Sequence, residues 1–341
     1  MNQKVSVIIV NFNGTEVIEE CLRTILNQTY KNFEVIVVDN DSKDGSPKII
    51  KDKFPEVTLI EEKYNHGFAG GNNIGYKYST GDIIILLNND TKVEKDYIEK
   101  FVKVFDDFPN CGAAQSKIVL FDEPEILDGA GSYWTGFTIL YHYGYLKNSN
   151  LDNFNRPYKV FTAKGASFIT KREIIEKVGL FDADFWHYYE EGDFCHKVIN
   201  AGYDIYYYPT TTCFHKSGYS RLILNKEDLI FFSNEKNRIL SFILNFKFPD
   251  VIFVLFKHLI IIFGFIILHH YNKFKDFLLK KERPLIGNAD VVKMTLKSIY
   301  WNIKNIKRTL EKRKRNLYKG SERDLPTKKV TLLQMMNPGK Y

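Results

Sequence analysis

The chain has 341 residues, of which 44% are hydrophobic and 15% aromatic, so it can bury the core of one large domain or of two unequal ones. The net charge of +7 is uneven, because residues 1–270 carry 29 basic and 35 acidic side chains, whereas residues 271–341 carry 19 and 6. This asymmetry predicts an anionic partner, either a membrane or a nucleic acid, for the C-terminal part. The four cysteines are widely spaced and the N-terminus lacks a signal-peptide pattern, which argues against disulfides or a zinc site and predicts a cytosolic protein.

The first 120 residues alternate between short β-branched runs and amphipathic stretches. Residues 17–26 and 97–105 place their apolar side chains on one face at helical spacing. Alternating helices and almost wholly apolar strands predict an α/β fold, in which a largely parallel sheet is covered by helices on both faces. The predicted strands are residues 5–10, 33–38, 57–60, 83–87 and 113–119.

The middle of the chain has weaker patterns. Residues 121–160 are rich in Gly, Asn and Tyr and predict loops with an edge hairpin. Residues 170–178 and 190–201 have helical periodicity. Residues 204–208 predict a strand that is stopped by the proline that follows them.

The composition changes near residue 226, which predicts a domain of residues 1–225 followed by a helical, basic region of residues 226–341. Residues 229–246 predict a helix rich in Phe and Ile, and residues 251–268 form an apolar run. Residues 289–316 predict one basic amphipathic helix.

The C-terminal region predicts a membrane contact. The run 251–268 is close to the ~20 residues that a span needs, but Lys257 lies inside it at a cost of about 2.5–3.5 kcal/mol. We therefore expect docking on the membrane surface, with apolar side chains among the headgroups and Lys and Arg against anionic lipid. The alternative is a helical subdomain that packs on the first domain or forms a dimer interface. Nucleic-acid binding is the weaker account of the charge, because no recognition fold accompanies it.

Polar side chains follow several predicted strands. Asn11 and Asn13 follow the first, Asp39 ends the second, and Asp90 follows a later apolar strand. Since the carboxyl ends of parallel strands meet at one edge, where open α/β sheets bind ligands, we expect these side chains to line a crevice. Asp39 there could accept hydrogen bonds from a nucleobase or ribose, and Asp90 could bind a metal. The alternative role is in turns and helix caps, which we favour for Asp44.

A glycine-rich stretch at residues 65–75 opens a predicted helix. Small residues at a helix start leave N–H groups that can face a phosphate. The spacing is neither Gly-x-Gly-x-x-Gly nor a P-loop, which disfavours a nicotinamide dehydrogenase and a P-loop nucleotidase. The alternative is a glycine-rich turn without a ligand.

Three carboxylates, Glu190, Glu191 and Asp193, crowd the start of a predicted helix. The helix dipole accounts for about 0.3–1 kcal/mol per acid, but crowded carboxylates repel unless a cation or a base role offsets the cost. One of them could accept the proton of an attacking hydroxyl. His215 follows a later strand. A lone histidine is more often structural than a ligand, but this one comes after Asp90 and the acid cluster in an order that suits a site.

These motifs together resemble the family-two inverting glycosyltransferases of GT-A fold, and most of all their bacterial rhamnosyltransferase-like branch. The resemblance covers about residues 4–240. Its motifs are residues 5–14, 37–42, 65–73, 87–90 and 189–193.

The resemblance implies a nucleotide-diphosphate-sugar donor, a divalent cation (Mg²⁺ or Mn²⁺) and single displacement with inversion. It implies that Glu191 is the general base, with Asp193 and Glu190 as rivals, and that Asp90 and His215 hold the cation. The residues implied for donor binding are Asn11, Asn13, Asp39, Asn65, Gly67, Phe68, Ala69, Gly71, Asn72, Asn88 and Asn89.

The resemblance also implies dTDP-rhamnose as donor and a cell-surface glycan on a polyprenyl diphosphate as acceptor. Such an enzyme would be cytoplasmic and peripheral on the inner face of the bacterial cell membrane, as a monomer or an oligomer. One alternative is a UDP-hexose, UDP-galactofuranose or UDP-N-acetylhexosamine donor. The other is a non-catalytic nucleotide-sugar-binding assembly protein, because Asn88 stands where many members of the family have a carboxylate.

Overall fold

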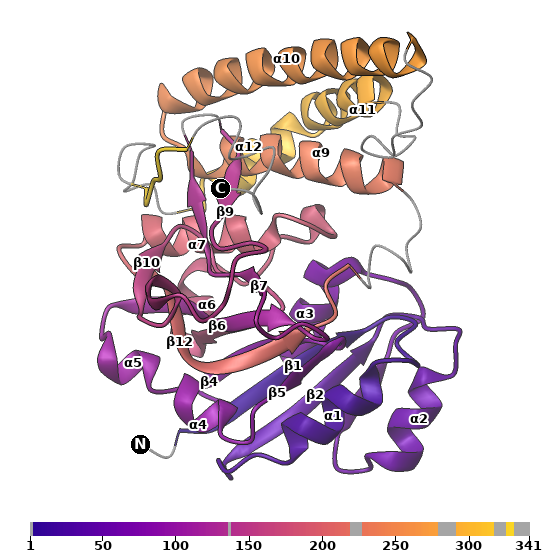
Figure 1. The fold of residues 1–341 in the computed structure, drawn as a ribbon, viewed down its shortest axis with the longest axis vertical. Helices are drawn as coiled ribbons and strands as arrows, with labels where there is room; N and C mark the ends of the chain where they lie inside the picture. Colours follow the sequence, from indigo (N-terminus) through magenta and orange to yellow (C-terminus); the bar gives the residue numbers. More distant parts are fainter. Residues whose placement is uncertain (1–2, 136–137, 219–226, 279–290, 317–324, 331–341) are drawn as a thin grey trace.

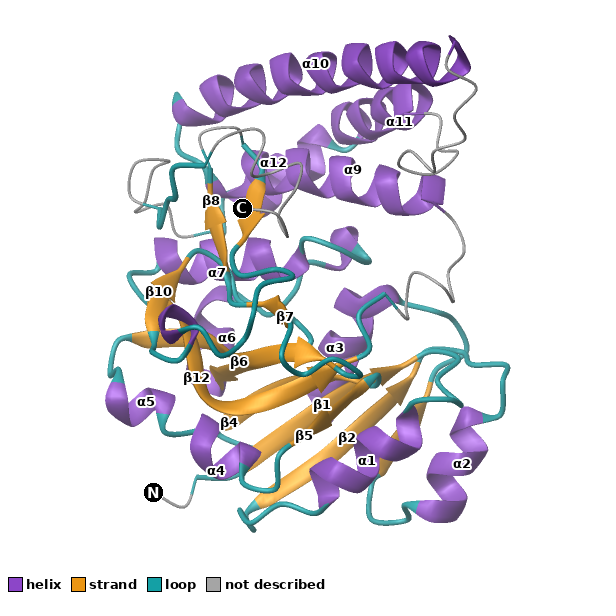
Figure 2. Ribbon diagram, viewed as in Figure 1, coloured by secondary structure: helices purple, strands orange, loops and turns teal. Residues whose placement is uncertain are grey.

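The computed structural model describes residues 3–135, 138–218, 227–278, 291–316 and 325–330. Figure 1 shows two layers, in which a twisted sheet with its covering helices lies below and a bundle formed by the C-terminal helices lies above. The same division is visible by secondary structure in Figure 2. The predicted α/β class is confirmed.

The main sheet has ten strands, eight of which follow the order β10-β12-β6-β11-β4-β1-β2-β3, while β5 pairs with β12 and β7 with β6. Strands β1 to β4 form a parallel block, and β11 runs antiparallel between β4 and β6. The sheet is therefore mixed. The strands are β1 (Val5–Asn11), β2 (Phe33–Asp39), β3 (Thr58–Glu61), β4 (Ile83–Asn88), β5 (Thr91–Val93), β6 (Cys111–Leu120), β7 (Leu127–Gly129), β10 (Tyr158–Val160), β11 (Ser167–Lys171) and β12 (Asp204–His215).

Helices cover both faces of this sheet, which explains why its central strands β1, β2 and β4 are mostly apolar on both faces. Alternate residues of β4 enter different cores: Ile85 faces the core that includes Ile18 of α1, and Leu86 faces the core that includes Phe194 of α7. The helices of this layer are α1 (Ile18–Leu26), α2 (Ser46–Lys53), α3 (Gly67–Tyr78), α4 (Tyr97–Phe101), α5 (Val104–Asp107), α6 (Arg172–Val178) and α7 (Glu190–Asn200), with short 3₁₀ turns at Asp152–Phe154 and Ala183–Phe185.

Two sequence predictions in this layer are wrong. The strand predicted to stop before Pro209 continues to His215, because the register with β6 shifts between Tyr207 and Thr212. Pro209 lies in that irregular stretch, where a strand tolerates a residue that cannot donate to the ladder. The helix predicted from residue 170 begins at Arg172, and the residues before it form β11.

Two further elements differ in detail from the prediction. The helix predicted at 97–105 is two short helices, α4 and α5. The hairpin predicted within 121–160 is present as β8 (Ser132–Trp134) and β9 (Leu140–His142), but these strands pair only with each other in a separate small sheet. All four cysteines are buried and free.

The upper layer consists of α9 (Glu227–Asn245), α10 (Asp250–Leu278), α11 (Val291–Lys304) and α12 (Ile306–Arg313). The single basic helix predicted at 289–316 is thus two helices, α11 and α12. The first two residues of that prediction lie outside the described residues. The domain boundary predicted between residues 225 and 226 also lies outside them. A shared core joins the layers, because Trp134 packs with Phe242 and Phe246 of α9. In the described ranges, no helix is both long and apolar enough to cross a membrane.

Candidate active site

The carboxyl ends of β1 and β2 form one wall of a polar site. The parallel register places Asn11 opposite Asp39, and the amide Nδ2 of Asn11 donates to Asp39 Oδ1 at 2.8 Å. Asp39 Oδ2 accepts from the backbone N–H of Ser42 at 3.0 Å. Asn13 joins the two loops, because its Oδ1 accepts from the backbone N–H of Lys43 at 2.8 Å. The predicted polar edge is thus one hydrogen-bonded unit.

The glycine-rich start of α3 lies beside this wall, but two of its N–H groups already have protein partners. Gly67 N–H donates to Asn65 Oδ1 at 2.8 Å, and Ala69 N–H donates to the carbonyl of Trp186 at 3.1 Å. The phosphate contact expected from the sequence therefore does not use these two groups. Asn72 Nδ2 caps the same turn by donating to the carbonyl of Phe68 at 2.9 Å.

The small residues of this stretch allow close packing. Gly67 has φ +69°, and a Cβ there would lie 2.1 Å from the carbonyl oxygen of Trp186. A Cβ on Gly71 would lie 2.7 Å from Val10 Cγ1. Glycine at both positions lets α3 approach β1 and the segment around Trp186, which is a structural reason for the motif.

The Asn88-Asn89-Asp90 turn connects the two sides of the site. Asn89 Nδ2 donates to Asn11 Oδ1 at 2.9 Å, so this amide belongs to the wall formed by β1 and β2. Asn88 Nδ2 lies 3.4 Å from His215 Nε2. Asp90 Oδ1 lies 3.3 Å from the same nitrogen, because β5 pairs with β12 so that Thr91 is opposite His215.

Asp90 and His215 fit a divalent cation. Asp90 is 2% exposed, and its Oδ1 has no hydrogen-bond partner among the described residues, an arrangement that is costly unless a charge compensates it. Burial lowers the pKa of His215, but the negative charges of Asp90 and Asp128 outweigh burial and raise it to about 9. Without a cation the imidazole is therefore protonated at neutral pH, and a cation bound at Nε2 would displace that proton. A carboxylate and an imidazole suit Mn²⁺ better than Mg²⁺, which prefers oxygen ligands.

No group of three His, Cys, Asp or Glu side chains that could hold a metal occurs within the described ranges. Asp90 and His215 would therefore hold a cation together with water or phosphate oxygens, as is usual for cations bound with a nucleotide.

Asp128 and Lys164 belong to this site and were not predicted from the sequence. His215 Nδ1 donates to Asp128 Oδ2 at 2.7 Å, and Lys164 Nζ pairs with the same oxygen. Although burial opposes it, the charges of Lys164 and His215 hold the pKa of Asp128 well below its usual range. A carboxylate on Nδ1 directs Nε2 toward Asp90 and makes it a better ligand. No sequence motif marks Asp128, because 87 residues separate it from His215.

We expect Asp128→Asn to weaken Mn²⁺ binding by about 10–100-fold, because an amide neither fixes the imidazole tautomer nor raises its basicity as a carboxylate does. Titration calorimetry with Mn²⁺ and UDP measures the effect. Asp122→Asn, in the loop after β6, is the control for loss of one acidic charge. Unchanged Mn²⁺ affinity in the Asp128 variant would contradict the assignment.

The three acids at the start of α7 have different surroundings. Glu191 Oε1 accepts from the backbone N–H of Gly165 at 2.9 Å, and a Cβ on Gly165 would contact both Glu191 Oε1 and Phe68 Cζ. Glu191 therefore lies beside the glycine-rich helix. Asp193 instead accepts from Asn245 Nδ2 at 2.5 Å and fixes α7 to α9.

Glu190 is 2% exposed, and its Oε2 lacks a hydrogen-bond partner within the described part of the chain. Burial, and then the charge of Glu191, raise the pKa of Glu190 well above its ordinary value. Burial also raises the pKa of Glu191 despite the hydrogen bond from Gly165, which brings this carboxylate closer to the range of a general base at neutral pH. Of the three predicted candidates, Glu191 has the geometry that best suits a base.

Comparison with known proteins gives relatives of one family. Residues 6–179 match the family model described as Glycosyl transferase family 2. The chain is 26% identical over 220 residues to the low-salt glycan biosynthesis hexosyltransferase Agl10 of Haloferax volcanii. The aligned region covers 59% of this chain and 65% of that protein. It is 33% identical over 87 residues to the UDP-Glc:alpha-D-GlcNAc-diphosphoundecaprenol beta-1,3-glucosyltransferase WfgD of Escherichia coli, covering 25% and 34%. The chain thus spans less than two thirds of the length of these curated relatives.

Two solved structures have a similar fold. A mannosyltransferase of Pyrobaculum calidifontis in complex with GDP-Man and Mn²⁺ has a TM-score of 0.53 at 20% identity, covering 92% of this chain and 84% of that one. GalNAc-T7 with UDP, GalNAc and Mn²⁺ has a TM-score of 0.55 at 17% identity, covering 70% and 47%. These likenesses concern the fold, which is GT-A. Since the family model matches more than half of the residues, the chain belongs to glycosyl transferase family 2.

Proposed function

We propose that the protein transfers a sugar from a nucleotide diphosphate to an acceptor hydroxyl, with inversion at the anomeric carbon. The observation that carries this proposal is the convergence of three groups at one edge of the sheet. They are the wall of Asn11 and Asp39, the pair of Asp90 and His215, and Glu191 beside Phe68. Inverting transfer needs a place for the nucleotide, compensation for the leaving diphosphate, and a base.

Each group has a chemical role in this proposal. Asp39 binds the nucleoside through hydrogen bonds to its carboxylate. Asp90 and His215 would hold a cation, which would supply positive charge for the departing diphosphate, and Lys164 adds a positive charge nearby. Glu191 accepts the proton of the acceptor hydroxyl as that oxygen attacks, while the Gly165 N–H holds its other oxygen in place.

The proposed donor is a UDP-hexose. The names of the two relatives give hexose and UDP-glucose, which favours a UDP-hexose over dTDP-rhamnose. Thermal stability should be measured with a panel of UDP-, GDP- and dTDP-sugars with and without Mn²⁺, because binding to the folded state raises the melting temperature. Release of the nucleotide diphosphate in the presence of acceptor then tests transfer, and its absence with every stabilising donor would reject the proposal.

A non-catalytic donor-binding protein is the second candidate, and the amide at Asn88 is the observation that favours it. An amide near His215 binds a cation more weakly than a carboxylate does. Stabilisation by a donor without nucleotide release, at any Mn²⁺ concentration, would support this candidate over the enzyme.

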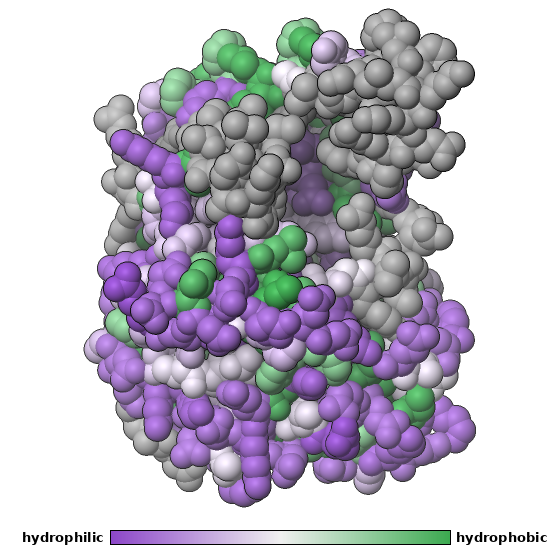
Figure 3. All heavy atoms as spheres, in the orientation of Figure 1, coloured by the Kyte–Doolittle hydropathy of each residue, from purple (hydrophilic) through white to green (hydrophobic). Residues whose placement is uncertain are grey.

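We base the proposed lipid-linked acceptor on the name of one relative and on an exposed apolar surface of this chain. The Escherichia coli relative is named for an acceptor on diphosphoundecaprenol, which is a membrane lipid. Helix α10 lies at the outer end of the molecule in Figure 1, and green apolar atoms gather over it in Figure 3. Its outer stripe consists of Ile252, Phe253, Phe256, Leu259, Ile260, Phe263 and Ile267, each between 48% and 65% exposed.

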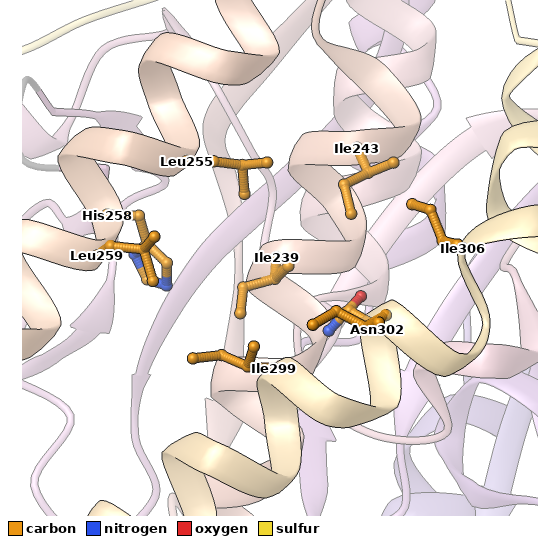
Figure 4. Close-up of a pocket in the computed structure, with 9 residues that line it drawn as sticks. Ile239, Ile243, Leu255, His258, Leu259, Ile299, Asn302 and Ile306 are labelled. Atoms are coloured by element: carbon orange, nitrogen blue, oxygen red, sulfur yellow. The ribbon is translucent and has the colours of Figure 1, made fainter.

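Helix α11 also exposes apolar side chains and positive charge. Tyr300 and Ile303 are 64% and 65% exposed, and Lys297 and Lys304 on the same helix are exposed. Between α9, α10 and α11 lies an apolar cavity of about 300 Å³, and Figure 4 shows side chains of all three helices pointing into it. Apolar stripes bordered by lysine suit the surface of an anionic bilayer, on the cytoplasmic side if the acceptor is assembled there.

We expect Phe256→Glu with Phe263→Glu to reduce binding to vesicles that contain phosphatidylglycerol by at least about tenfold, because two exposed aromatic side chains that would enter the bilayer are replaced by carboxylates that the anionic surface repels. Sedimentation with the vesicles measures binding. Tyr78→Glu, which is also on an exposed side chain but in α3, is the matched control. Equal binding by all three proteins would show that α10 is not the docking surface.

A further inference from the structure

The segment that leads into α7, residues 185–189, has an unusual backbone. Trp186, Tyr188 and Tyr189 have φ values of 61°, 69° and 75°, and none of them is glycine. Side chains disfavour this left-handed region, so three such residues within four positions persist only where surrounding contacts hold them. Glu191 follows two residues after Tyr189, so the shape of this segment determines where the proposed base lies.

One amide in the C-terminal layer contacts this segment three times. Asn237 of α9 is 0% exposed, and its Nδ2 lies 2.9 Å from the carbonyl oxygen of Phe185, 2.9 Å from that of His187 and 2.6 Å from that of Tyr188. An amide has two hydrogens, so these bonds are shared. The carbonyl of Phe185 also accepts from the N–H of His187 at 2.7 Å. Asn237 is thus the donor that links the carbonyls of Phe185, His187 and Tyr188 to α9.

The opposite side of the segment is held by α3. Asn73 Nδ2 donates to the carbonyl of Phe181 at 2.7 Å, and Asn73 Oδ1 accepts from the N–H of the same residue at 3.1 Å. Ala69 N–H donates to the carbonyl of Trp186. The segment is therefore held between α3 and α9, and Lys236, next to Asn237, donates to the carbonyl of Asp184.

From these contacts we propose that Asn237 is a positioning residue for Glu191. It holds the left-handed turn that aims the first residues of α7 at Gly165, so the C-terminal layer completes the active site in addition to packing on it. The inference rests on the proposed function, since it concerns the base of that reaction. Asn237 acts through the backbone and does not contact the substrate.

The test compares Asn237→Ala with Asn302→Ala. Asn302 is a matched control, because it is also a buried amide whose Nδ2 donates to backbone carbonyls, those of Lys236 and Ser298, but it does not reach the segment. Both variants lose buried hydrogen bonds and should be destabilised similarly. Asn237→Ala should lower kcat by about 10–100-fold with the donor Kd unchanged, because small misplacements of reacting groups cost about that much. Asn302→Ala should keep kcat.

Hydrogen exchange separates this inference from the proposed function. Backbone amides of residues 185–192 should exchange at least about tenfold faster in Asn237→Ala than in Asn302→Ala, whether or not any donor is turned over. Asn237→Ser, which keeps one hydrogen-bond donor, should give an exchange rate and a kcat between those of the wild type and Asn237→Ala. It replaces the alanine variant in the test if that variant does not fold. If Asn237→Ala and Asn302→Ala have equal exchange rates in this segment and equal kcat values, Asn237 is not a positioning residue. If the wild type transfers no sugar, the proposed function fails while the exchange comparison still decides the inference.

Discussion

Replacing Glu191 with Gln should lower kcat by about 10²–10⁴-fold while the donor binds with unchanged affinity. The amide keeps the size of the side chain and can still accept from the Gly165 N–H, but it cannot take the proton of an acceptor hydroxyl. Nucleotide release with acceptor measures the first quantity, and calorimetry with donor and Mn²⁺ measures the second. Near-normal turnover would remove Glu191 from the role of base.

The neighbouring acids provide controls with different expected outcomes. The raised pKa of Glu190 means that the folded state favours the neutral acid, so its ionisation destabilises the fold as pH rises above the ordinary value near 4.5. Glu190→Gln copies the neutral form and should keep turnover and raise the melting temperature at neutral pH. Asp193→Asn weakens the contact with Lys197 and should mainly lower stability.

Replacing Asp90 with Asn should weaken Mn²⁺ binding by at least about 100-fold and lower turnover by about 10²–10³-fold. The reason is that, in the proposed mechanism, the buried carboxylate oxygen 3.3 Å from His215 Nε2 would supply the negative charge that holds a cation beside the diphosphate. Calorimetry of Mn²⁺ binding, with and without UDP, measures the affinity separately from turnover.

Asn88→Asp is a control variant that should change the Mn²⁺ affinity in the opposite direction. It places a second carboxylate next to His215, so Mn²⁺ should bind more tightly than to the wild type. If Asp90→Asn and Asn88→Asp both leave the affinity unchanged, the cation is not held at this turn. If only the Asn88 variant has no effect, its side chain does not reach the cation.

Local patterns predicted the parallel part of the fold well. The runs that became β1, β2 and β4 are apolar at successive positions because helices cover both faces, and this property is visible in the sequence itself. The polar residues at the ends of these strands were predicted to meet, and Asn11, Asp39 and Asn89 are hydrogen-bonded to one another in a chain. Parallel pairing alone brings these strand ends together, so no long-range contact had to be guessed.

Prediction was poorer where pairing depends on distant partners. Strand β11 was missed because its position between β4 and β6 is set by its neighbours on both sides. Pro209 was expected to end a strand, but a shift in register accommodates it. At the glycine-rich helix start, where the sequence predicts N–H groups that can face a phosphate, the N–H groups of Gly67 and Ala69 donate to Asn65 Oδ1 and to the carbonyl of Trp186. The second of these acceptors is distant in the chain.

The sequence by itself determined the α/β class, the polar edge of the sheet and the candidates Asp90 and Glu191, because strand periodicity and strand ends are local properties. Tertiary structure alone decided how these residues are supported. Asp128 contacts His215, which is 87 residues away in the chain. Asn237 contacts the segment before Glu191, which is about 50 residues away. Such contacts carry no sequence signal, since they depend on how the layers pack and on which buried polar atoms then need a partner.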